Sequence, residues 1–267
     1  MRTGVLIPIR GFPRFLEETL DSVLAQDPDE VVVVDDGSFE PLRSDRVRVV
    51  RRDVPGGPGA ARATGLEALG DVDVIALCDA DDTWEPGCLA ALVDGLRAEP
   101  GAAAAFGRAT VVGIDGRPTG ERWQEPAGGL HEPAAFYAHN PIPTSCSAIR
   151  RSALERAGGF AAPDVVAEDW DLWLRLPGPL LCVPAARIRY RRHPGGLTAD
   201  VERLARAQLA LHERHAQLVG AAAAQQAQAA DRRALSRARA RRVLGRTGSG
   251  QAAPARTPTP RDRRAAR

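Results

Sequence analysis

The chain has 267 residues, 44% hydrophobic and 26% charged, a composition that is ordinary for a globular protein with a substantial core. All 36 basic residues are arginine, which excludes Schiff-base chemistry and a P-loop because both need a lysine amine at a fixed place. The net charge of +2 hides an asymmetry. Residues 1–220 hold 24 arginines and 32 acids, a charge of −8, whereas residues 221–267 hold 12 arginines and two acids, a charge of +10.

The four cysteines are widely spaced and form no C-x-x-C pair. This spacing argues against a zinc site and favours a reducing compartment. The apolar run Val5–Ile9 is shorter than a signal-peptide core, and no apolar stretch approaches the ~20 residues that a membrane span needs. We therefore expect a cytoplasmic protein.

Strand-like and helix-like patterns alternate in the first hundred residues. Gly4–Ile9, Val31–Val34 and Val47–Val50 are apolar runs of strand length, and apolar spacings of three and four predict a helix between the first two. A glycine-rich entry leads into a helix at 56–69, and Val74–Cys78 is a further buried strand. This order predicts an α/β fold with a mostly parallel central sheet, whose ligands lie beyond the carboxyl ends of the strands.

The second half of the chain has fewer clear elements. We expect helices at Leu89–Leu96, Ser152–Ala157 and Ala167–Leu176, and strands at Ala102–Ile114, Ile142–Ile149, Leu180–Val183 and Ile188–Tyr190. Thr198 is expected to cap a helix that runs to about Val219. His212 and His215 on that helix have no pattern of acids or cysteines around them, so we expect them on the surface. Ala221–Leu244 is expected to be helical, and Thr247–Arg267 disordered.

Three carboxylates follow one buried strand, because Val74–Cys78 ends at Asp79, Asp81 and Asp82. Carboxylates at this density repel one another unless they are paired or bind a cation, and oxygen ligands suit Mg²⁺ or Mn²⁺. Our leading hypothesis is a divalent metal that holds phosphate oxygens. The alternative is an acidic turn that caps the next helix, with Pro86 as an early helical residue.

Two further features point to the same crevice. Asp36 ends the strand Val31–Val34, and Arg62 lies one turn into the helix after Gly56. The glycines fit a dinucleotide fingerprint only loosely, because Arg62 occupies its third glycine position, so an NAD site is disfavoured. Glycines admit a ligand close to the backbone, and a guanidinium there can reach a phosphate or a base carbonyl. The alternative is that they only make a tight turn.

An acidic pair opens the helix predicted at Ala167–Leu176. Trp170 and Trp173 share a helical face and are expected mainly in the core. Asp169 in the first turn has two interpretations: an acid that compensates the helix dipole, or a general base at the mouth of the crevice.

Separate motifs occur in one order over residues 3–198. They are Val5-Leu6-Ile7-Pro8, Val31–Ser38, Gly59–Leu66, Asp79-Ala80-Asp81-Asp82, Arg150-Arg151 with Gly158-Gly159-Phe160, Glu168–Arg175, and Tyr190-Arg191-Arg192-His193. Together they resemble the family-2 inverting glycosyltransferases, which have a single nucleotide-binding α/β domain called the GT-A fold. The resemblance implies such a domain at 1–220, with a nucleotide-binding part at 1–100, an acceptor part at 101–198 and a C-terminal helix at 199–220. An Arg/Ala-rich tail follows at 221–267.

The resemblance also implies a role for each motif residue. On the donor side, Pro8 and Asp36 would bind the nucleotide base, Arg62 would bind the base or the diphosphate, and Asp79 would contact the ribose or metal region. Asp81 and His193 would bind the Mn²⁺ or Mg²⁺ ion. Asp169 would be the catalytic base, and Glu168 and Trp170 would lie on the acceptor side. The implied reaction moves a sugar from a nucleotide-diphosphate sugar, with UDP the first expectation, to an acceptor hydroxyl with inversion.

Residues around the expected nucleotide pocket depart from the family pattern at Arg10-Gly11, Phe39 and Ala63, and these changes bear on the base rather than on the fold. A non-catalytic binding protein of the same fold is one alternative. A nucleotidyltransferase is another, although it typically needs lysine. The acceptor is not indicated. The basic tail is expected to be solvated; the other expectation is contact with anionic lipid at the inner face of a membrane, and nucleic acid is not favoured.

Overall fold

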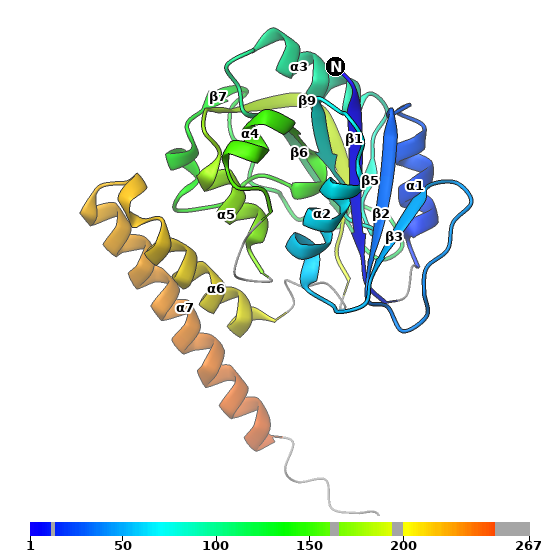
Figure 1. Cartoon of the computed structure of the whole chain (residues 1–267). Helices are drawn as coiled ribbons and strands as arrows, with labels where there is room; N and C mark the ends of the chain where they lie inside the picture. Colours follow the sequence, from blue (N-terminus) through cyan, green and yellow to red (C-terminus); the bar gives the residue numbers. More distant parts are fainter. Residues whose placement is uncertain (12–13, 161–165, 194–199, 249–267) are drawn as a thin grey trace, which may run out of the picture.

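The computed structural model describes residues 1–11, 14–160, 166–193 and 200–248, and over 241–248 it gives the helix alone. In this part of the chain, one sheet has the strand order β3-β2-β1-β4-β8-β6-β9-β5, with β7 paired to β9 (Figure 1). The strands are β1 (Thr3–Ile9), β2 (Glu30–Asp36), β3 (Arg48–Arg52), β4 (Val74–Leu77), β5 (Thr83–Trp84), β6 (Ala104–Val112), β7 (Gly129–His131), β8 (Ser147–Arg150) and β9 (Leu180–Arg191). β1 to β4 are parallel, as are β6 and β9, whereas β8 is antiparallel to β4 and β6. β5 and β7 are antiparallel to β9. The predicted α/β fold with a large central sheet is confirmed, and its parallel pairing is concentrated in β3-β2-β1-β4 and in β6–β9.

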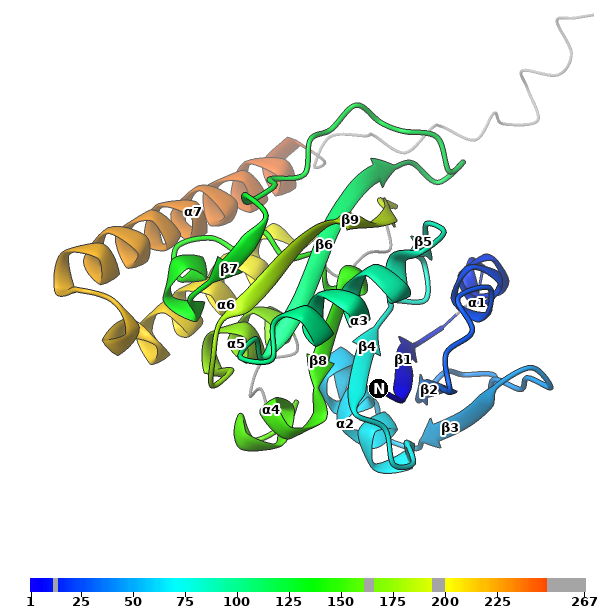
Figure 2. The ribbon, with the colours of Figure 1, turned by 90° about the horizontal axis from the view of Figure 1, so that it is seen from above.

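Helices cover both faces of this sheet (Figure 2). They are α1 (Leu16–Leu24), α2 (Gly57–Ala68), α3 (Cys88–Ala98), α4 (Arg151–Arg156), α5 (Glu168–Arg175), α6 (Val201–Arg214) and α7 (Ala221–Gly248). Side chains alternate along β1, so Leu6 packs with α2, α4 and α5, whereas Val5 and Ile7 pack with α1 and α3. Because both faces are covered, the central strands β1 and β4 are apolar over nearly their whole length and do not alternate with polar residues.

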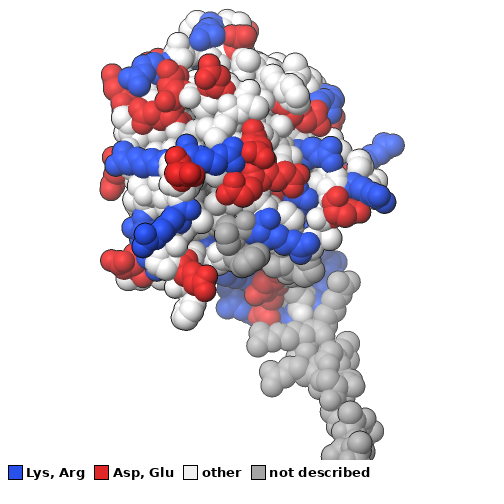
Figure 3. All heavy atoms as spheres, turned by 90° about the vertical axis from the view of Figure 1, so that its right-hand side faces the viewer, with Lys and Arg blue, Asp and Glu red and all other residues white. Residues whose placement is uncertain are grey.

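Strand β3 forms one edge of the sheet, and three of its five residues are arginine. Arg51 Nη1 lies 2.6 Å from Asp35 Oδ2 and Arg52 Nε lies 2.9 Å from Asp36 Oδ1, both on β2. Acidic and basic side chains are intermixed over the face that carries α1 and β3 (Figure 3). Charged side chains on an edge strand hinder its pairing with another chain.

Three predicted elements differ from the structure. The two strands expected at Leu180–Val183 and Ile188–Tyr190 are a single strand, β9, whose pairing with β6 shifts register between Phe106 and Arg108. Within Ile142–Ile149, a 3-10 turn (Thr144–Cys146) follows Pro143, and only Ser147–Arg150 forms a strand. A proline has no N–H for a sheet ladder, which explains the late start of β8.

The helix-capping alternative for the acidic stretch is wrong. Thr83 and Trp84 form the short strand β5, which pairs with β9, and α3 begins only at Cys88. The residue before α3 is Gly87, in a left-handed conformation at φ 81°, and no side chain caps the helix. The three acids therefore lie in the β4–β5 connection and not in a helix terminus.

The C-terminal helices form a hairpin against the domain (Figure 1). Asp200 caps α6, since its side chain accepts a hydrogen bond from the Arg203 N–H. The cap predicted at Thr198 is therefore wrong. Thr198 itself lies outside the described residues. The helix predicted at Ala221–Leu244 is confirmed as α7. It packs on α6 and buries Ala224, Asp231 and Leu235, so the part of α7 up to Leu235 is not the solvated tail that we expected.

His212 and His215 are only 2% and 5% exposed, so their predicted surface location is wrong. His212 Nδ1 lies 2.5 Å from Asp231 Oδ2 on α7, and His215 Nε2 lies 2.9 Å from Asp171 Oδ1 on α5. The partners come from other helices, and therefore no pattern within α6 reveals them.

All four cysteines are buried and free of disulfides. In the residues that the structure describes, no helix combines the length and the apolarity needed to cross a lipid bilayer. Most of the predicted disordered segment, from 249 onward, lies outside the described residues.

Candidate active site

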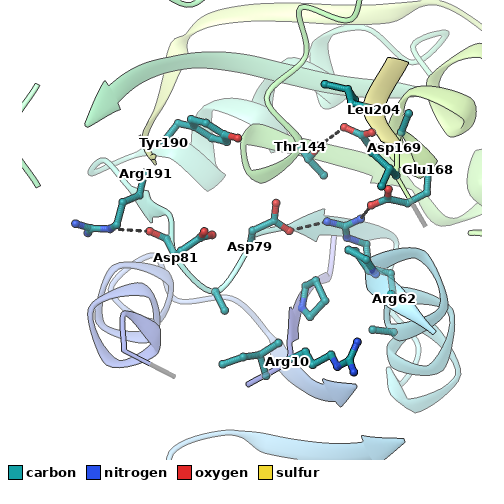
Figure 4. A pocket seen from close by; sticks show the side chains of 18 of the residues that line it. Arg10, Arg62, Asp79, Asp81, Thr144, Glu168, Asp169, Tyr190, Arg191 and Leu204 are labelled. Atoms are coloured by element: carbon teal, nitrogen blue, oxygen red, sulfur yellow. Dashed lines mark hydrogen bonds and ion pairs between the residues drawn. The ribbon is translucent and has the colours of Figure 1, made fainter. Parts of the chain in front are cut away.

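A cleft of about 1260 Å³ opens beyond the carboxyl ends of β1, β2 and β4 (Figure 4). It is lined by all nine residues that the sequence singled out: Pro8, Asp36, Arg62, Asp79, Asp81, Glu168, Asp169, Trp170 and His193. Parallel strands bring their carboxyl ends to one edge of the sheet, which explains why motifs far apart in the chain converge here.

The three clustered aspartates divide into two groups. Asp79 and Asp81 line the cleft, whereas Asp82 is only 1% exposed. Asp82 accepts hydrogen bonds from Ser145 Oγ at 2.6 Å and from the Arg191 N–H at 2.8 Å. Burial, with Asp81 and Asp79 nearby, raises the pKa of Asp82 well above its ordinary value. Asp82 therefore holds the loop, and the other two carboxylates face the ligand space.

Asp81 has the environment of a cation ligand. Its Oδ2 lies 2.8 Å from His193 Nε2. Burial and the charge of Asp79 raise the pKa of Asp81, although His193 opposes this. A divalent cation would relieve the repulsion between the two carboxylates, and oxygen atoms with one imidazole suit Mn²⁺ or Mg²⁺. The described residues contain no cluster of three His, Cys, Asp or Glu side chains that could hold a metal on its own, so phosphate oxygens would have to complete the ligand set.

Arg62 connects the two sides of the cleft (Figure 4). Its guanidinium is 2% exposed and lies 2.6 Å from Asp79 Oδ1 and 2.8 Å from Glu168 Oε1. Burial alone would lower the pKa of Arg62, but the charges of Asp79 and Glu168 outweigh it and raise that pKa. A Cβ at Gly59 would lie 3.1 Å from Glu168 Cγ, so the glycine-rich entry to α2 gives Glu168 room to reach Arg62.

Asp169 lies at the start of α5 with its carboxylate held in place. Its Oδ2 accepts hydrogen bonds from Thr144 Oγ1 at 2.5 Å and Asn140 Nδ2 at 3.3 Å, and its Oδ1 accepts one from the Trp170 N–H at 2.7 Å. The preceding Ala167 has φ 66°, a left-handed conformation that costs free energy in a residue with a Cβ. Strained backbone of this kind is concentrated at functional sites, and here it lies two residues before Asp169.

Thr144 and Asn140 are site residues that no sequence pattern predicted. They lie in the proline-rich turn around Pro141 and Pro143, where the sequence shows polar residues but no periodicity that would indicate a direction. Trp170 lines the cleft as predicted, yet it is 5% exposed and its Nε1 donates to the Phe136 carbonyl oxygen at 2.7 Å. Trp170 therefore mainly anchors α5 to the Phe136 segment, because its only polar side-chain atom is already hydrogen-bonded.

Asp36 lies in the cleft wall, but its oxygen atoms are already engaged. Oδ1 accepts hydrogen bonds from Arg52 Nε at 2.9 Å and the Gly56 N–H at 3.0 Å, and Oδ2 accepts one from the Gly57 N–H at 2.7 Å. Asp36 is 2% exposed. In this structure its carboxylate fixes the turn that begins α2.

Glu168 should make stability depend on pH. Burial and the charge of Asp169 raise its pKa to about 7, against the opposing effect of Arg62. A raised carboxyl pKa means that the folded state binds more protons, so the free energy of unfolding falls as pH rises from about 4.5 to 7, by about 3 kcal/mol. Urea unfolding of Glu168→Gln should show this fall removed, whereas Glu155→Gln, at an exposed side chain, should retain it. Parallel pH curves for wild type and Glu168→Gln would contradict the assignment.

The arrangement defines a class of protein. An α/β sheet, two cleft-facing aspartates after β4 and an acidic pair at the start of α5 correspond to the motifs by which the sequence resembles the GT-A glycosyltransferases. The chain belongs to glycosyl transferase family 2, since the sequence profile of that family matches residues 4–158.

Sequence relatives match only part of their own length. The chain is 33% identical over 106 residues to an uncharacterized glycosyltransferase, alr2836, of Nostoc sp. (strain PCC 7120), and 38% identical over 87 residues to the succinoglycan biosynthesis protein ExoW of Rhizobium meliloti. These matches cover 35% and 28% of this chain, and 32% and 27% of those proteins.

Solved structures share the fold at low sequence identity. S. aureus TarS 1-349 in complex with UDP-GlcNAc has a TM-score of 0.62 at 16% identity, over 86% of this chain and 71% of that one. The mannosyltransferase PcManGT from Pyrobaculum calidifontis, in complex with GDP-Man and Mn²⁺, has a TM-score of 0.61 at 21% identity, over 94% and 76%. At these identities the likeness establishes the GT-A fold.

Proposed function

We propose that the protein transfers a sugar from a nucleoside-diphosphate sugar to an acceptor hydroxyl, with inversion at the anomeric carbon. The observation that carries this proposal is the placement of two acidic groups across one cleft. Asp79 and Asp81 lie on one side, Asp169 lies on the other, and Arg62 spans the space between them. The nucleotide-sugar complexes of two proteins with this fold support the donor class.

The donor side would hold the diphosphate. Asp81 and His193 are the residues that would hold Mn²⁺ or Mg²⁺ together with phosphate oxygens of the donor, and the ion would stabilise negative charge on the leaving diphosphate. The Arg62 guanidinium keeps its charge at all working pH values and is fixed between two carboxylates. A preorganised cation at this position stabilises charge as it develops, without reorganising during the reaction.

Asp169 would act as the general base. Its carboxylate takes the proton of the acceptor hydroxyl while that oxygen forms a bond to the anomeric carbon. The bond between this carbon and the phosphate oxygen breaks on the opposite face, and its electron pair leaves with the nucleoside diphosphate. Thr144 and Asn140 hold Oδ2 of the base, so the carboxylate keeps its orientation through the displacement.

The identity of the donor nucleotide and the cellular location are proposed on grounds other than the geometry of the cleft. The expectation of a UDP-sugar rests on the family resemblance alone, because Asp36 has its oxygen atoms engaged within the chain. A cytoplasmic location is proposed from the four free, buried cysteines.

Calorimetric titration with UDP, GDP and dTDP, with and without Mn²⁺, tests the donor site. We expect metal-dependent binding of at least one nucleotide, weakened about 10-fold or more by Asp81→Asn, because this substitution removes one negative charge from the cation site. Asp94→Asn, at an exposed side chain on α3, should bind as wild type does. Absence of binding for all three nucleotides would favour the non-catalytic alternative. A nucleotide affinity that changes neither on removal of Mn²⁺ nor in Asp81→Asn would contradict the metal assignment.

A further inference from the structure

The order of groups along the cleft locates the nucleoside, given the proposed function on which this inference rests. Thr144 and Asp169 lie at one end, Asp79 and Arg62 in the middle, and Arg10 beyond them (Figure 4). If the diphosphate lies at Asp79 and the acceptor at Asp169, the nucleoside extends away from Asp169. It therefore points toward Arg10.

Arg10 is an exposed cation at that end. It directly follows β1, is exposed and lines the cleft. Three other cleft arginines are engaged with carboxylates: Arg62 with Asp79 and Glu168, Arg191 with Glu18, and Arg192 with Glu121. No side-chain hydrogen bond, ion pair or ring contact is formed by Arg10 within the part of the chain that the structure describes. Its guanidinium donors are available to a ligand.

Asp36 is the acidic side chain of the same end, and both of its carboxylate oxygens already accept hydrogen bonds. Arg52 Nε and the backbone N–H groups of Gly56 and Gly57 donate to it at 2.7 to 3.0 Å. The cleft lining also includes the apolar residues Pro8, Ile9 and Pro55. A base that must donate N–H groups would have to break the turn that begins α2, whereas a base that offers acceptor atoms finds Arg10 ready.

We propose that Arg10 reads the nucleotide base and favours guanine over uracil. A guanidinium presents two parallel N–H donors, and guanine offers two neighbouring acceptors, N7 and O6, that match this spacing. Uracil has the acceptor O4 next to the N3–H donor, so only one of the two guanidinium N–H groups would find an acceptor. Adenine places an amino donor beside N7 and would repel it. The proposal thus replaces the UDP expectation with a GDP-sugar.

Titration of GDP, UDP and ADP with Mn²⁺ present tests the role of Arg10. Wild type should bind GDP about 10-fold more tightly than UDP, and Arg10→Ala should bring this ratio close to one by weakening GDP alone. Arg10→Lys keeps the charge but lacks the two parallel N–H donors, so it should also lose the preference for GDP over UDP. Arg43→Ala, at an exposed arginine outside the cleft, should leave the ratio unchanged.

Three results would overturn the inference in distinguishable ways. Tighter binding of UDP than GDP by wild type, or an unchanged ratio in Arg10→Ala, would exclude base reading by Arg10. An equal loss of all three nucleotides in Arg10→Ala, restored by Arg10→Lys, would place Arg10 on the phosphates. Absence of any nucleotide binding in wild type would instead contradict the proposed function, and this inference with it.

Discussion

Replacing Asp169 by asparagine is expected to lower kcat for sugar transfer by about 10²- to 10⁴-fold, the usual contribution of a positioned general base. Asparagine keeps the shape of the side chain and can still accept the hydrogen bond from Thr144 Oγ1, but it cannot take the proton of the acceptor. The nucleotide site lies across the cleft, and its affinity for nucleoside diphosphates should stay within about twofold of wild type. Steady-state kinetics and calorimetry on the same variant measure the two effects separately.

The control for this variant is Asp115→Asn, at a carboxylate that is largely exposed. It removes the same charge outside the cleft and should retain wild-type kcat. Near-normal transfer by Asp169→Asn would show that another group takes the proton. A parallel loss of nucleotide affinity would show that Asp169 acts through the donor site.

Replacing Asp171 by asparagine should lower the free energy of unfolding by about 3 kcal/mol, because it removes the charge at the centre of a buried ion cluster. Asp171 is 2% exposed, and its carboxylate lies 2.7 Å from Arg175 Nε, 2.7 Å from Arg214 Nη1 and 2.9 Å from His215 Nε2. Arg214 ends α6 and His215 directly follows it, so the cluster docks α6 against the helix that carries Asp169. Urea unfolding of the full chain measures the loss. Glu213→Gln, in a half-exposed pair with Arg232, should cost at most about 0.5 kcal/mol.

The effect of Asp171 should depend on pH. Burial alone would raise the pKa of Asp171, but hydrogen bonds from His215, Arg175 and Arg214 outweigh it and hold that pKa well below its usual range. A carboxyl with a depressed folded pKa stabilises the protein above its unfolded pKa of about 4, and this stabilisation is lost as the pH falls further. The stability difference between wild type and Asp171→Asn should therefore shrink in acid. A difference that is equally large at about pH 3 and pH 7, or below about 1 kcal/mol at pH 7, would contradict this account.

Local patterns predict the sheet and the members of the cleft well. Val31–Val34 and Val74–Cys78 are apolar runs that end in aspartates, and two parallel strands must bring such ends to one edge. For this reason the sequence alone predicts that Asp36 and Asp79 lie at the same crevice. The helical face of the two tryptophans predicts that the acidic pair before Trp170 lies in the first turn of α5, but only the family resemblance implies a catalytic role for Asp169.

Long-range partners set the limit of the sequence analysis. His212 is buried because Asp231 on another helix reaches it, and the Asp171 cluster draws on residues 43 and 44 positions away. No periodicity within one helix encodes these contacts. Thr144 stands 25 residues before Asp169 in an irregular turn, so its hydrogen bond to the base depends on how β8 and α5 pack. The engagement of Asp36 by the Gly56–Gly57 turn is likewise a tertiary feature.

The stereochemistry of sugar transfer to water tests the central claim most directly, because it needs no knowledge of the acceptor. The protein would be incubated with Mn²⁺ and GDP-mannose or UDP-glucose, and the first released sugar would be observed by ¹H NMR before it mutarotates. We predict release of the nucleoside diphosphate together with a sugar of inverted anomeric configuration, dependent on Asp81 and Asp169. Retention of configuration would contradict the single displacement, and absence of release from both donors would contradict the proposed transfer itself.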